Sequence, residues 1–124
     1  MTDLFLIASG LLGIATGIGH SLLGERNVLR PLFAEDASAV LRKGRMRELL
    51  RGVWHLPSLT WIVLGLALVQ SGLAGNGSAI AATAGTIFVL SGLANWMVLK
   101  SFHIGGAMAV ATGCLAFAAV LTGA

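Results

Sequence analysis

The stretch LFLIASGLLGIATGIGHSLL, residues 4–23, decides the fold of this chain. It contains no Asp, Glu, Lys or Arg. An α-helix of about 20 residues, rising about 1.5 Å per residue, crosses a hydrocarbon core of about 30 Å. We therefore expect a membrane-spanning helix here. Similar apolar runs at residues 53–69, 79–99 and 104–121 predict three more spans.

The composition of the whole chain agrees with four spans. Of its 124 residues, 56% are hydrophobic and only 10% are charged, and the mean hydropathy is +0.90. A soluble domain of this length needs more polar surface. Backbone groups in lipid must be satisfied within each segment, and the alternating pattern of barrel strands is absent. The sequence thus predicts an all-α polytopic membrane protein, with residues 1–124 as a single four-helix bundle.

The basic residues predict the orientation of this bundle. They lie between the first two apolar runs and, for Lys100, between the last two: Arg26, Arg30, Arg42, Lys43, Arg45, Arg47, Arg51 and Lys100. With four spans, both connections share one side, which the positive-inside rule makes cytoplasmic. We expect a multi-pass inner-membrane protein with both termini outside. The sequence pI near 10.0 follows from this topology, so no nucleic-acid partner is expected.

The connection at residues 24–52 has a pattern of its own. Pro31 is expected to break any helix near its start. Residues 37–50 mix apolar and basic side chains, which predicts an amphipathic helix on the surface of the inner leaflet. The lipid bilayer, with anionic headgroups at this loop, is the first partner that the sequence implies.

Glycine stripes predict how the helices pack. Gly10, Gly13, Gly17, His20 and Gly24 are spaced three or four residues apart, so they share one helix face. Small residues on a membrane helix form its packing face. The other runs carry comparable stripes: His55, Ser58, Ile62, Gly65, Val69, Gly72; Ser78, Ala81, Gly85, Phe88, Gly92, Asn95; and His103, Gly106, Val110, Gly113.

Each stripe ends in a polar side chain near the expected cytoplasmic boundary. His20 ends the first run, His55 begins the second, Asn95 ends the third and His103 begins the fourth. These four residues are expected to form one polar layer, together with Arg51 and Ser58. Polar groups in membrane helices join helices by hydrogen bonds or serve a function.

Three interpretations of the histidines stay open at this point. In the first, the layer is structural. In the second, it binds a cofactor: His20, His55 and His103, joined by Glu25, bind a transition metal, or two of the histidines hold a haem. In the third, the layer is a path for protons or substrate. No HxxxH, HExxH or CxxCH motif favours a metal or haem.

The predicted function follows the first interpretation. We expect a small, non-enzymatic accessory or scaffold protein of the inner membrane, acting as a homo-oligomer or with another membrane protein. The alternatives are a metal- or haem-binding redox protein and a proton-coupled transporter or membrane enzyme. The lone Cys114 and the absence of GxSxG and phosphate-loop motifs leave no other chemistry to assign, so the catalytic residues are unknown.

Overall fold

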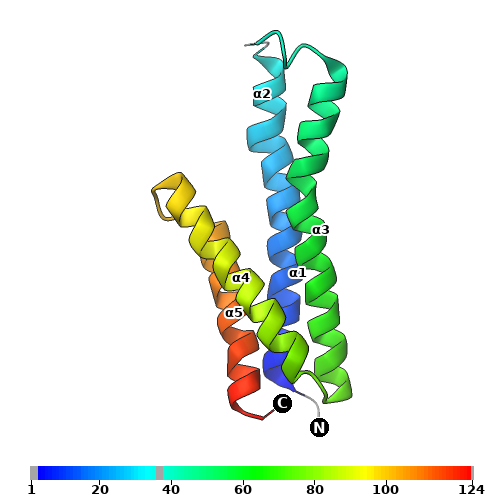
Figure 1. Cartoon of the computed structure of the whole chain (residues 1–124), viewed down its shortest axis with the longest axis vertical. Helices are drawn as coiled ribbons and strands as arrows, with labels where there is room; N and C mark the ends of the chain where they lie inside the picture. The colour runs from blue at the N-terminus through cyan, green and yellow to red at the C-terminus, as the bar shows by residue number, and fades with distance from the viewer. Residues whose placement is uncertain (1–2, 36–37, 124) are drawn as a thin grey trace.

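The computed structural model of the chain describes residues 3–35 and 38–123, and all the secondary structure in these residues is helical. Two antiparallel pairs, α1 with α3 and α4 with α5, make up the molecule (Figure 1). The elements are α1 (Leu4–Gly24), the π-helical turn η1 (Glu25–Leu29), α2 (Arg30–Ala34), α3 (Gly44–Ala74), α4 (Ser78–Leu99) and α5 (Ile104–Leu121).

Within residues 3–35 and 38–123, four helices are long and apolar enough to cross a membrane: Leu4–Ala34, Gly44–Ala74, Ser78–Leu99 and Ile104–Leu121. Each predicted span lies within one of them, so the all-α fold class is confirmed. Large apolar side chains such as Leu11, Leu59, Leu66 and Leu90 remain at least half exposed on the outside of the bundle. A soluble protein rarely exposes so much apolar surface. The chain is a multi-pass membrane protein whose outer faces contact lipid.

The glycine stripes form the packing faces that the sequence predicts. In the α1–α3 pair, a Cβ built on Gly65 would lie 2.6 Å from the carbonyl oxygen of Gly10. In the α4–α5 pair, a Cβ built on Gly113 would lie 2.6 Å from the carbonyl oxygen of Gly85. Real side chains are not found at such distances, so both helix pairs depend on glycine for their close approach.

The two pairs are joined mainly through α1, which packs against both α3 and α5. Phe88 of α4 is fully buried and reaches Gly13 of α1, where a Cβ would lie 2.7 Å from the tip of the ring. The Ser9 hydroxyl of α1 donates to the carbonyl oxygen of Thr112 of α5, at 2.7 Å. Toward the turn at residues 100–103, α4 and α5 tilt away from α1 and α3 (Figure 1).

The predicted connection at 24–52 is largely helical in the structure. Leu4–Ala34 and Gly44–Ala74 each contain 31 residues, about 46 Å of helix, whereas the hydrocarbon core is about 30 Å thick. The two helices are therefore longer than the core requires, and their paired ends, residues 25–34 and 44–53, are called the hairpin extension. Arg47 and Arg51 place their guanidinium groups 5.9 and 5.2 Å from the ring centroid of Phe33, which links the two arms.

Pro31 does not break the first helix, contrary to the sequence prediction. The π-helical turn η1 comes directly before it, with the Arg30 N–H bonded to the carbonyl oxygen of Glu25, five residues back. Proline lacks an N–H and its ring clashes with the carbonyl four residues earlier. The wider π turn moves that carbonyl away, so the helix continues through α2.

The amphipathic helix that the sequence predicts at 37–50 is not a separate element among the described residues. Ala37 lies outside the described residues, and the second half of the segment is the first part of α3. Arg45, Arg47 and Arg51 thus lie on an arm of the hairpin extension rather than on a separate helix. Arg47 and Arg51 of this arm contact Phe33 of the other arm.

Candidate functional site

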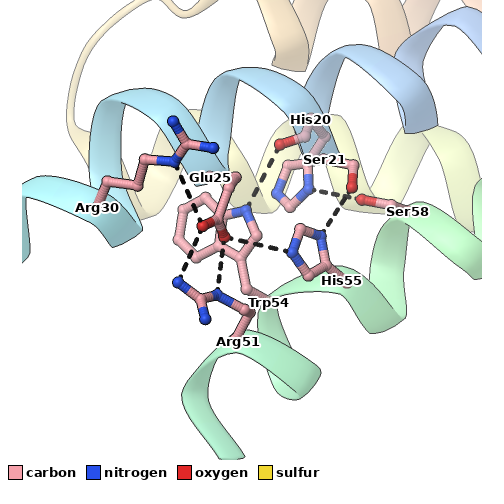
Figure 2. Close-up of polar contacts among 8 residues, drawn as sticks. All are labelled: His20, Ser21, Glu25, Arg30, Arg51, Trp54, His55 and Ser58. Atoms are coloured by element: carbon pink, nitrogen blue, oxygen red, sulfur yellow. Dashed lines mark hydrogen bonds and ion pairs between the residues drawn. The ribbon is translucent and has the colours of Figure 1, made fainter. Parts of the chain in front are cut away.

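Two histidine–serine pairs join α1 and α3 near the start of the hairpin extension (Figure 2). His20 Nδ1 lies 3.0 Å from the Ser58 hydroxyl, and His55 Nδ1 lies 2.7 Å from the Ser21 hydroxyl. Each helix thus contributes one imidazole and one hydroxyl. All four side chains are partly or fully buried, so these hydrogen bonds satisfy polar groups that would otherwise be costly in the membrane.

The Glu25 carboxylate is contacted by three side chains near the histidine–serine pairs: Arg30, Arg51 and His55 (Figure 2). Arg51 donates to both carboxylate oxygens, from Nε at 3.1 Å and from Nη2 at 3.0 Å. Arg30 Nε lies 3.7 Å from Oε1, and His55 Nε2 lies 3.6 Å from Oε2. The paired fork geometry of Arg51 is the strongest of these contacts, so it fixes the carboxylate.

Two tryptophans of α3 enclose the ring of His20. Trp54 stacks on it with 5.0 Å between centroids, and Trp61 meets it edge-on at 5.2 Å. The Trp54 indole N–H also donates to the carbonyl oxygen of His20, at 3.5 Å. A Cβ on Gly24 would overlap the Trp54 ring, so the last glycine of the predicted stripe makes room for this indole.

A cavity of about 410 Å³ lies between the two helix pairs, on the side where they tilt apart. Apolar residues and glycines form most of its wall, and Trp54 and Trp61 are among them. All four long helices contribute to the wall. Its polar lining residues are Thr16, His20, Asn27, Ser91, Asn95 and His103.

Asn95 is the unusual member of this lining. Its Oδ1 is buried and, among the described residues, makes no hydrogen bond. Buried side-chain oxygens in proteins nearly always have a partner, and leaving one without a partner costs about 1–3 kcal/mol. The oxygen therefore marks a point in the cavity wall where a hydrogen-bond donor is missing.

His103 acts as the N-cap of α5. Its Nδ1 accepts a hydrogen bond from the Gly105 N–H at 3.1 Å, which satisfies one free donor at the start of the helix. The neutral ring then carries its proton on Nε2. The carbonyl oxygen of His103 accepts from the Trp96 indole N–H at 3.1 Å, so α4 holds this turn in place.

The structure separates the predicted polar layer into two groups. Three members of the layer lie at the α1–α3 junction beside Glu25: His55, Arg51 and Ser58. Two others, Asn95 and His103, lie on the second helix pair. His20 belongs to both, because it bonds Ser58 and also lines the cavity. Sequence reasoning missed Ser21 and Trp54 as members of the site. Ser21 directly follows His20 in the sequence, and Trp54 directly precedes His55.

The metal and haem predictions receive no support from the geometry. In residues 3–35 and 38–123, no three His, Cys, Asp or Glu side chains are placed to hold a metal ion. His103 also offers the wrong atom, because a ring that accepts at Nδ1 presents an N–H at Nε2, not a lone pair. Glu25, the carboxylate of the predicted metal site, accepts hydrogen bonds from Arg51 at both of its oxygens.

Ser21, His55 and Glu25 form a chain with the residue types of a hydrolase triad. The Ser21 hydroxyl meets Nδ1 of His55, but the Glu25 carboxylate is 3.6 Å from Nε2 and is held by Arg51. A triad needs the acid to orient the imidazole, and its serine must face the substrate. Neither Ser21 nor His55 is part of the cavity wall. These three side chains therefore connect α1 with α3.

Comparisons with known proteins yield no assignment, because no family, no curated protein and no solved structure matches this chain.

Proposed function

We propose that this protein is a non-enzymatic accessory protein of the inner membrane that binds a small amphiphilic molecule between its two helix pairs. The observation that carries the proposal is the cavity of about 410 Å³. Sites for small molecules span about 300–1,000 Å³, are mostly apolar and contain a few polar groups. The cavity has this size and composition.

The engagement of the histidines supports a non-enzymatic role. His20 and His55 bond hydroxyls across the α1–α3 interface, and His103 caps α5. Each imidazole therefore has a structural partner at Nδ1. Of the interpretations that the sequence left open, the structural one accounts for all three contacts.

Orientation and assembly are part of the same proposal. The described end of α5 and the start of α1 lie at one end of the molecule, opposite the hairpin extension (Figure 1). With the basic extension in the cytoplasm, both termini face outward and the wide side of the cavity opens near the inner leaflet. Homo-oligomer formation and a membrane-protein partner stay predictions.

A blocking variant tests the proposal. A Cβ on Gly19 meets nothing within 4 Å, and Gly19 lines the cavity, so Gly19→Phe places a ring in it without displacing backbone. Gly52→Phe is the matched control, since Gly52 is exposed, has no neighbour within 4 Å and lies outside the cavity. Both variants are purified in detergent and titrated with radiolabelled dodecanol.

We expect one saturable dodecanol site in the wild-type protein and in Gly52→Phe, and none in Gly19→Phe. Binding that is unsaturable in the wild-type protein, or equal in all three proteins, contradicts the proposal. Circular dichroism of each variant establishes that the helices are intact.

A further inference from the structure

We infer that the cavity selects an uncharged amphiphile whose head group is a hydroxyl, held between Asn95 and His103. The inference rests on the proposed function, because it names the chemistry of the molecule that this cavity takes. It follows from the atoms that the cavity wall offers and from those that it lacks.

Asn95 requires a donor from the ligand. Its Oδ1 is buried without a partner among the described residues, and it belongs to the cavity wall. A bound O–H group would supply the missing hydrogen bond. An ether or an alkyl chain at the same place would leave the oxygen unsatisfied.

His103, an exposed side chain at the start of α5, offers a donor. The Gly105 N–H holds its Nδ1 as an acceptor, so the neutral ring offers Nε2–H, and no described residue accepts from it. His103 lines the same cavity as Asn95. A hydroxyl group donates one hydrogen bond and accepts others, so it has the chemistry that both residues call for.

The lining also selects against charge. Among its described members there is no Asp, Glu, Lys or Arg, because Glu25, Arg30 and Arg51 bind one another outside it. A carboxylate or ammonium group in this cavity would lose water without gaining a counter-ion. Burial of an unpaired charge is far more costly than burial of a hydroxyl.

The positions of the polar and apolar residues fit the orientation of an amphiphile. Asn95 and His103 lie beside the turn between α4 and α5, at the wide end of the cavity. Trp61, Met108 and Ala109 lie one to two helical turns deeper and form an apolar wall. A hydroxyl at the turn would direct an alkyl chain toward the bilayer centre.

Four probes of one chain length test the head group: dodecanol, dodecyl methyl ether, dodecane and dodecanoate. Each competes against radiolabelled dodecanol for the detergent-solubilised protein at equal mole fraction in the micelles. We expect dodecanol to bind about tenfold more tightly than the ether, the cost of one unsatisfied buried acceptor. Dodecane should bind no better than the ether, and dodecanoate should bind most weakly.

Two variants assign the preference to Asn95. Asn95→Leu removes the buried oxygen and should reduce the preference for dodecanol over dodecane by about tenfold, with dodecane still bound and the contribution of His103 retained. Asn76→Leu, the same change in the α3–α4 turn away from the cavity, should keep the preference. Circular dichroism and dodecane binding show whether each variant is folded.

The outcomes separate this inference from the proposed function. Equal competition by the ether or by dodecane overturns the hydroxyl assignment and leaves a cavity that binds apolar chains. Stronger competition by dodecanoate overturns the selection against charge. Failure of every probe to bind saturably contradicts the proposed function itself.

Discussion

Two glycines on α1, only two residues apart, should respond oppositely to the same substitution. A Cβ on Gly17 would lie 2.7 Å from the carbonyl oxygen of Ser58 and 2.8 Å from Cγ1 of Ile62. A Cβ on Gly19 meets nothing within 4 Å. Gly17→Ala should therefore force α1 and α3 apart, whereas Gly19→Ala should fit.

Comparing the two variants isolates the steric cost of the added methyl group in the free energy of unfolding. Both changes replace glycine by alanine in the same helix, so the gain in helix propensity, about 1 kcal/mol, is common to both and cancels. The remaining difference is the cost of overpacking, about 1–3 kcal/mol. The contact of Gly17 is with backbone, which cannot move without moving the helix, so we expect Gly17→Ala to be less stable by that amount.

The measurement is the free energy of unfolding in mixed micelles, titrated with a denaturing detergent and followed by circular dichroism and tryptophan fluorescence. Gly52→Ala, at an exposed position with no neighbour within 4 Å, is a second reference. Equal stability of Gly17→Ala and Gly19→Ala would refute the claim that the glycine stripe sets the α1–α3 distance.

Three other predictions concern the polar contacts and the orientation. Glu25→Arg should destabilise the hairpin extension, and adding Arg51→Glu should restore thermal stability, because the fork contact is re-formed with reversed charges; a double variant no better than the single one contradicts the pairing. In a double-mutant cycle of His20→Ala with Ser58→Ala, unfolding should show a coupling of about 0.6 kcal/mol, typical of hydrogen bonds between membrane helices, and additive effects would argue against the contact. A reporter active only in the cytoplasm should work when fused after Gly44 and be silent when fused after Ala124, and activity at both sites would exclude the proposed topology.

The spans and the packing faces could be predicted because both depend on local sequence. An uncharged run of about 20 residues has one stable form in lipid, the helix. Spacings of three and four residues place Gly10, Gly17 and Gly24 on one face whatever the partner is. The structure buries all three of these glycines.

The partners of those faces could not be predicted. All four helices carry a small-residue stripe, and nothing in the spacing says that Gly10 meets Gly65 while Gly85 meets Gly113. The hairpin extension was missed for a related reason. Its basic residues fit a surface helix equally well, and only the contacts of Phe33 and Glu25 across the two arms distinguish the alternatives.

The candidate site was predicted in part. The sequence placed His20, Asn95 and His103 at similar depth, and all three line one cavity. It could not place the cavity, because the tilt between the two helix pairs depends on contacts such as Phe88 with Gly13. Nor could it assign the histidine contacts, since a ring nitrogen's partner depends on the rotation of each helix.

Photolabelling with a diazirine derivative of dodecanol tests the central claim most directly. After irradiation of the protein in lipid nanodiscs, the labelled residues are located by mass spectrometry of its peptides. We predict that the label enters the cavity wall on α1 and α5, at residues 19–24 and 104–109, and that excess dodecanol prevents it. Label confined to lipid-facing residues such as Leu59, Leu66 and Leu90, and unaffected by excess dodecanol, would contradict the claim that this cavity is a binding site.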